Sequence, residues 1–87
     1  MSYLISEQYT WKSLKQGVVI LNLGEGTYYT LNEEASVIWK GLMENLSVDM
    51  IAETMLDEFD CTYEQALADI EEYVTSCIDE GVLLKQE

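Results

Sequence analysis

The sequence contains no histidine, no arginine and no proline, and only two of its residues are cysteines, Cys61 and Cys77. The absence of histidine removes the most common general base and the most common zinc ligand. The two cysteines are too few for a disulfide scaffold and too far apart for a CxxC motif. No acid/base pair or activated nucleophile is visible either. We therefore expect a protein that is not an enzyme, with no catalytic residue, no metal site and no cofactor.

Long hydrophobic runs are also missing. No stretch reaches the roughly 18 apolar residues that a membrane-spanning helix needs, so no membrane partner is expected. The first residues lack a basic region followed by an apolar run, which predicts no secretory signal and a cytoplasmic location. Hydrophobic residues still make up 48% of the 87 residues, the usual share for a packed core. We expect one domain over residues 1–87.

Positive charge is scarce. Four lysines face 17 acidic residues, and the net charge is −13. Residues 44–87 carry most of it, because Lys85 stands there against 13 acids, 1 − 13 = −12. Nucleic acids and anionic membranes bind through Lys and Arg, so we expect neither as a partner. Neutral or positively charged peptides are compatible with this charge, and an alternative interpretation is that the acids only keep the protein soluble.

The first third of the sequence has the residue types and the period of β-strands. Strands are predicted over about 9–13, 17–23 and 27–31, with glycines in the turns between them. Turns this short favour a meander of three antiparallel strands. The middle strand is almost continuously hydrophobic, which is typical of a strand covered on both faces.

From Asn32 onwards the hydrophobic period changes to that of helices. Three helices are predicted, over about 33–46, 48–59 and 63–80. Asn32, Ser47 and Thr62 are good N-cap residues, and Thr62 begins a capping box. Residues 82–84 are expected to form an extended tail that packs back on the helices. The predicted fold class is α+β, a three-stranded antiparallel sheet followed by a three-helix winged helix-turn-helix bundle.

Several short segments occur together in an order and spacing that point to one family. They are Gly26-Thr27-Tyr28-Tyr29-Thr30-Leu31-Asn32, Ala35, Ile38-Trp39, Ser47-Val48, Asp69-Ile70, Tyr73-Val74 and Gly81-Val82-Leu83. On these segments, which spread over roughly residues 9–84, the sequence resembles the PqqD-like family. Its members are small domains that recognise leader peptides in the biosynthesis of ribosomally made, modified peptides.

The resemblance implies a non-catalytic peptide-binding module. The leader peptide of a precursor would lie along the third strand as a fourth strand, with side chains in the cleft between that strand and the third helix. A maturation enzyme would then act on the captured precursor. The lack of proline separates this sequence from the members of quinone-cofactor synthesis, which tend to have Pro-rich N-terminal segments.

The sequence looks most like the freestanding leader-binding proteins of lasso-peptide biosynthesis, whose partner is a leader peptidase of the cysteine-protease type. Two alternatives stay open. One is the PqqD-type peptide chaperone of quinone-cofactor biosynthesis, and the other is an acidic winged-helix adaptor for a different protein contact.

The third predicted strand has neither proline nor lysine, two residues that commonly protect a sheet edge from pairing. We expect the backbone of Tyr28 to Leu31 to pair with the leader. Tyr29 and Leu31 share one face, for which plain core packing is the alternative. Tyr28 lies on the other face, where it either packs beside Val18 and Ile20 or contacts the leader.

On the third helix, Asp69, Tyr73 and Ser76 lie on one flank of the apolar arc. The resemblance favours this flank as the wall of the cleft, with Tyr73 lining it and Asp69 or Glu72 pairing with a basic leader residue. The alternative for the acids is a solvated face. The candidate leader-binding residues are Thr27, Tyr28, Tyr29, Thr30, Leu31, Asp69, Ile70, Glu72, Tyr73 and Ser76.

Overall fold

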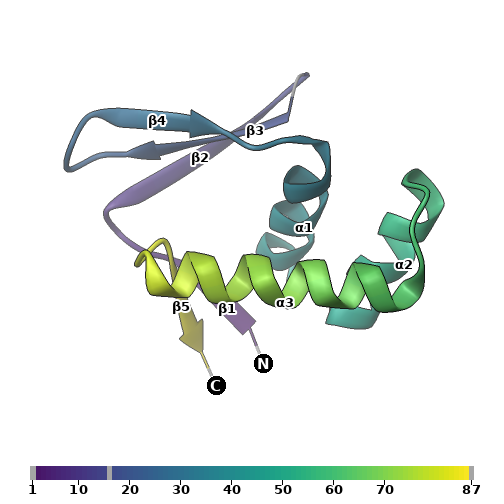
Figure 1. Ribbon diagram of the computed structural model, residues 1–87. Coiled ribbons are helices and arrows are strands. Elements are labelled where there is room, and N and C mark those ends of the chain that lie inside the picture. The colour runs from purple at the N-terminus through teal and green to yellow at the C-terminus, as the bar shows by residue number, and fades with distance from the viewer. Residues whose placement is uncertain (1, 16, 87) are drawn as a thin grey trace.

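The computed structural model describes residues 2–15 and 17–86, so Gln16 in the predicted first turn lies outside the described residues. The elements are β1 (Ser2–Ile5), β2 (Tyr9–Leu14), β3 (Gly17–Asn22), β4 (Thr27–Thr30), α1 (Glu33–Met43), α2 (Val48–Glu58), α3 (Tyr63–Asp79) and β5 (Leu83–Gln86) (Figure 1). Strands β2, β3 and β4 form an antiparallel sheet in that order. The predicted α+β class, a three-stranded sheet followed by three helices, is confirmed, while the winged helix-turn-helix description stays an interpretation.

A second sheet of two strands joins the two ends of the described chain. β1 pairs antiparallel with β5, from Ser2 opposite Gln86 to Ile5 opposite Leu83. In Figure 1 the two chain ends therefore lie close together, below α3. The extended tail was expected but its partner was not, because the pairing joins segments at opposite ends of the chain and no local pattern reveals it.

The strand β3 is covered on one face only, so the expectation of a strand covered on both faces is wrong. Val18 and Ile20 are fully buried, whereas Leu21 between its neighbours is 37% exposed. All three helices lie on the same side of the β2–β3–β4 sheet (Figure 1). We call the other side the outer face. Its cross-strand rows are Thr10, Leu21 and Tyr28, and Lys12, Val19 and Thr30.

Each helix begins at a side chain that caps it. Asn32 Oδ1 accepts a hydrogen bond from the Ala35 N–H, and Ser47 Oγ accepts one from the Met50 N–H, at 2.8 and 3.2 Å. Thr62 forms the predicted capping box. The first helix ends at Met43, earlier than expected, because Asn45 takes a left-handed conformation with φ 61°, which asparagine tolerates well.

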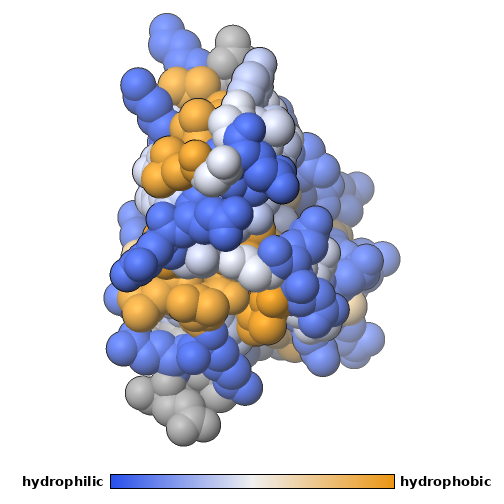
Figure 2. All heavy atoms as spheres, turned by 90° about the vertical axis from the view of Figure 1, so that its left-hand side faces the viewer, coloured by the Kyte–Doolittle hydropathy of each residue, from blue (hydrophilic) through white to orange (hydrophobic). Residues whose placement is uncertain are grey.

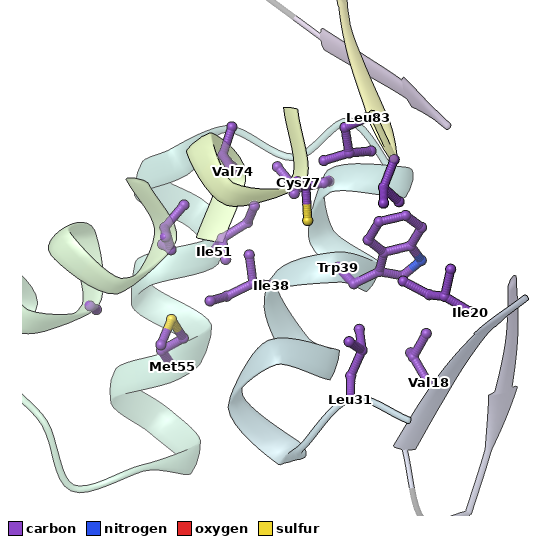
Figure 3. Close-up of a cluster of buried hydrophobic side chains, with 14 of the residues drawn as sticks. Val18, Ile20, Leu31, Ile38, Trp39, Ile51, Met55, Val74, Cys77 and Leu83 are labelled. Atoms are coloured by element: carbon purple, nitrogen blue, oxygen red, sulfur yellow. The ribbon is translucent and has the colours of Figure 1, made fainter. Parts of the chain in front are cut away.

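The core is centred on Trp39 of α1, which is fully buried (Figure 3). Its ring packs edge-on against Trp11 of β2, with the ring centroids 6.2 Å apart and the planes at 76°, a favourable aromatic geometry. The same core cluster contains residues from β3, α2, α3 and β5, so both sheets and all three helices meet in it. The labelled members in Figure 3 are Val18, Ile20, Leu31, Ile38, Trp39, Ile51, Met55, Val74, Cys77 and Leu83.

A buried serine fastens the sheet to the start of α1. Ser36 Oγ accepts a hydrogen bond from the Val18 N–H at 2.9 Å, and its hydroxyl donates to the Leu31 carbonyl at 3.4 Å. The Leu31 N–H in turn donates to the Val18 carbonyl at 2.8 Å. These bonds fix the point at which β4 ends and the chain turns into α1.

We predict that Ser36→Ala lowers the free energy of unfolding by about 1–3 kcal/mol, because it leaves the buried Val18 N–H without an acceptor. The measurement is urea unfolding followed by tryptophan fluorescence. Ser13→Ala, at an exposed position of β2, is the control and should change the free energy by less than about 0.5 kcal/mol. Equal values for the two variants would contradict the structural role of Ser36.

Candidate functional site

The strand β4 is an edge strand with no second partner among the described residues. It pairs with β3 alone, and all four of its residues are exposed. An edge strand presents backbone N–H and C=O groups to which another strand can be added. With neither proline nor lysine, β4 is open to such pairing.

A groove opens beside the end of this strand. It has a volume of about 280 Å³ and lies between the first turns of α1 and the middle of α3. Its lining residues are Asn32, Glu34, Ala35, Ile38, Asp69, Glu72, Tyr73 and Ser76. Asn32 lies two residues after Thr30, the last residue of β4, so the groove begins close to the point where the strand edge ends.

The structure places most of the predicted α3 residues together in this groove. Asp69, Glu72, Tyr73 and Ser76 all line it, on the flank that the sequence analysis favoured. Ile70 does not line it, because it points into the core with 1% of its surface exposed. It can support the groove from beneath but is not available for direct contact in this structure.

The predicted residues of β4 divide between the two faces of the sheet. Tyr28 is 69% exposed and pairs across the strands with Leu21 on the outer face. The alternative that it packs beside Val18 and Ile20 is therefore wrong, since both of those point to the opposite face.

On the inner face, Tyr29 is 41% exposed, while Leu31, just after the strand, is 7% exposed and belongs to the core. Thr27 and Thr30 are both exposed. The side chain of Leu31 is thus not available to a leader. Both of its backbone groups also bond within the chain, the N–H to the Val18 carbonyl and the carbonyl to the Ser36 hydroxyl, so the role predicted for Leu31 is not supported.

Two tyrosines and a thiol form an uncharged wall where β4 faces α3. The Tyr73 hydroxyl is buried without a hydrogen-bond partner in good geometry, and burial and the nearby Cys77 raise its pKa. Burial, followed by Cys77 and Glu80, raises the pKa of Tyr29 to about 12. Burial also raises the pKa of the Cys77 thiol. All three groups are neutral at physiological pH, which suits contact with apolar side chains.

The rest of the groove is acidic. Glu34, Asp69 and Glu72 bring carboxylates from two helices around the apolar side chains of Ala35 and Ile38, and no lining residue is basic. Such a surface favours a neutral or basic ligand. Within residues 2–15 and 17–86, no group of three or more cysteine or acidic side chains could hold a metal ion. No helix in the described part of the chain is long and apolar enough to cross a membrane.

The α1 side of the groove was not predicted from the sequence. Asn32 was expected only to cap the helix, and Ala35 and Ile38 only to resemble the family's pattern. One signal could have found them, namely that α1 starts almost directly after the edge strand. Its first turn must then lie beside the end of that edge.

We predict that Tyr73→Phe makes the free energy of unfolding fall less steeply as the pH rises into the alkaline range. The pKa of Tyr73 in the folded protein is raised above its ordinary value of 10.0. Above pH 10 the unfolded chain therefore releases a proton that the folded chain retains, and stability falls. The variant lacks this contribution. At pH 7 it should be as stable as the wild type or about 1 kcal/mol more stable, because an unpartnered buried hydroxyl is removed.

The measurement is urea unfolding at a series of pH values from about 8 to 11.5, chosen to bracket this titration. Tyr29 and Cys77, whose pKa values are also raised, should still cause some loss in both proteins. Parallel curves for wild type and variant would contradict the buried, protonated state of the Tyr73 hydroxyl.

Comparisons with known proteins agree with this architecture. A solved structure described as "Lasso peptide synthetase B1 complexed with the leader peptide" matches with a TM-score of 0.86 and 25% identity, over 98% of this chain and 100% of that chain. A second, "TbiB1 in Complex with the TbiA(beta) Leader Peptide", matches in fold with a TM-score of 0.81 and 23% identity, over 100% of this chain and 99% of that chain. No curated protein matches the chain significantly.

The family comparison covers the sheet edge and the groove. The family described as "Coenzyme PQQ synthesis protein D (PqqD)" matches residues 17–83. This range runs from the first residue of β3 to the first residue of β5, and it includes β4, α1 and α3. The chain belongs to the PqqD family.

Proposed function

We propose that this protein recognises the leader segment of a ribosomally synthesised precursor peptide and catalyses no reaction itself. The observation that carries the proposal is the open edge of β4 together with a groove between α1 and α3 whose lining begins at Asn32, two residues after that strand. Membership of the PqqD family supports it. So does the likeness to a lasso peptide synthetase B1 whose structure contains a leader peptide.

The leader adds to β4 as a fourth strand. Backbone hydrogen bonds to residues 28–30 supply affinity that does not depend on the leader's sequence, and alternate leader side chains point towards α3. There they meet the uncharged wall of Tyr29 and Tyr73 and the apolar groove residues Ala35 and Ile38. Apolar leader residues gain most from this burial, and the carboxylates of the groove favour a basic neighbour.

The captured precursor is delivered to a separate maturation enzyme. The likeness to lasso peptide synthetase B1 supports the lasso-peptide pathway, in which the enzyme would be a leader peptidase of the cysteine-protease type. In this proposal residues 1–87 act as one recognition domain, and the work takes place in the cytoplasm.

A second candidate function is that of a peptide chaperone in quinone-cofactor biosynthesis. It is favoured by the family description, coenzyme PQQ synthesis protein D. Both functions use the same surface and differ in the precursor that is bound. Binding measurements with leader peptides of the two kinds distinguish them.

The first test is an NMR titration of labelled protein with leader peptides from precursors encoded beside its gene. A peptide of about ten residues should bind with a dissociation constant of roughly micromolar or below, about −8 kcal/mol. Shifts should concentrate at residues 27–31 and on the groove flank of α3, and the backbone amides of β4 should gain protection from hydrogen exchange. A peptide of the same composition in scrambled order is the control. If the protein gives a well-folded spectrum that no leader peptide perturbs, the proposal is wrong.

A second prediction concerns the acids of the groove. The double variant Asp69→Asn, Glu72→Gln should weaken leader binding about two- to fivefold at low salt, since exposed charge pairs contribute only about 0.2–1 kcal/mol. The loss should appear mainly in the association rate. It should shrink towards zero near about 0.5 M salt, because salt at roughly that concentration screens exposed charges.

The matched control is Glu71→Gln, Asp79→Asn, which removes the same charge from α3 residues that do not line the groove. Stopped-flow fluorescence gives both rates. If wild-type binding itself collapsed in 0.5 M salt, charge rather than burial would carry the affinity, and the described mode of binding would be wrong.

A further inference from the structure

The outer face of the β2–β3–β4 sheet carries apolar residues that nothing in the described chain covers. Leu21 and Tyr28 are cross-strand neighbours on it and are both exposed, and Val19 lies in the adjacent row. A strand that is hydrophobic on both faces, as β3 is, normally lies between two layers. Here the chain supplies one layer, the helices, and the second is open (Figure 1).

Figure 2 shows hydrophobic atoms in two areas on the side of the molecule that it views, with hydrophilic atoms between them. The upper area lies at the height of the β2–β3–β4 sheet, and the lower one at the height of α3 and the two-stranded sheet. On the outer face itself, Leu21 is 37% and Tyr28 is 69% exposed, and exposed apolar surface on a small protein commonly marks an interaction site.

The charge of this part of the chain differs from that of the rest. Residues 8–24 contain Lys12 and Lys15 and no acid, which gives +2. The remaining residues hold two lysines and all 17 acids, 2 − 17 = −15. Lys12 lies on the outer face beside Val19, so the strands of this face combine apolar side chains with a positive charge.

We propose that the outer face is the docking surface for the maturation enzyme that acts on the captured peptide, an inference that rests on the proposed function. The enzyme covers Leu21 and its neighbours with apolar side chains and places a carboxylate against Lys12. Its overall charge is neutral or positive, because the field of a chain with net charge −13 attracts such a protein. A second copy of this chain carries the same −13 and is repelled at long range.

Continuity with the peptide site supports this occupant. A leader strand added to β4 extends the same sheet, so every second leader residue faces outward beside Tyr28. An enzyme seated on the outer face therefore touches the recognition protein and the bound leader together. The groove on the opposite flank of α3, lined by Tyr3, Leu67 and Ile78 among others, has no such continuity with β4.

The test measures binding of the cysteine-protease leader peptidase encoded with this chain, by calorimetry, to wild type and three variants of the full chain. Leu21→Glu should weaken binding at least tenfold. Lys12→Glu, at an exposed position, should weaken it about threefold and serves if Leu21→Glu does not fold. The matched control is Leu56→Glu on α2, because Leu56 is also 37% exposed. This control variant should bind the peptidase like the wild type.

Leader affinity, measured in parallel, should change by less than twofold in all three variants. Wild-type enzyme affinity in Leu21→Glu and Lys12→Glu, or an equal loss in Leu56→Glu, would overturn the docking site. A chain that binds the leader but not the peptidase would also overturn it while leaving the proposed function standing. A dimer seen by sedimentation that Leu21→Glu dissociates would assign the face to self-association instead.

Discussion

Burial of the Trp39 side chain is the interaction on which the rest of the structure depends. Its indole buries roughly 150–250 Å², a gain of about 4–6 kcal/mol at the usual coefficient. The ring nitrogen has no hydrogen-bond partner, which costs about 1–3 kcal/mol, so burial wins. Trp39 holds α1 against the sheet, while Ile38, its neighbour in sequence, is a core residue that also lines the groove. The same turn of helix thus contributes to the core and to the site.

Local features of the fold followed from the sequence, and features that depend on distant contacts did not. The caps at Asn32, Ser47 and Thr62 were predictable because each uses hydrogen bonds to residues three positions away. The pairing of β1 with β5 was not, because its pattern is spread over both ends of the chain. The flank of α3 that lines the groove could be chosen only through the family resemblance, since helical periodicity treats the two flanks alike.

The open outer face shows why burial is harder to infer than periodicity. The hydrophobic run of β3 predicted two covering layers, and the chain provides one. Hydrophobic side chains in a sequence can be those that are buried only in the functional complex, where a partner covers them. The same reasoning explains Tyr28, an aromatic residue that is 69% exposed on this face.

The antiparallel pairing of β1 with β5 has a mechanical consequence. Ser2 and Gln86 are opposite each other at the open end of this pair, and the hydrogen bonds of an antiparallel pair run across the strands. A pulling force on the two ends would therefore load these bonds one after another and open the pair like a zipper, at low force. The edge of β4 and the groove bear none of this force until Ile5 and Leu83 separate. Tension on the chain ends therefore leaves the site in place.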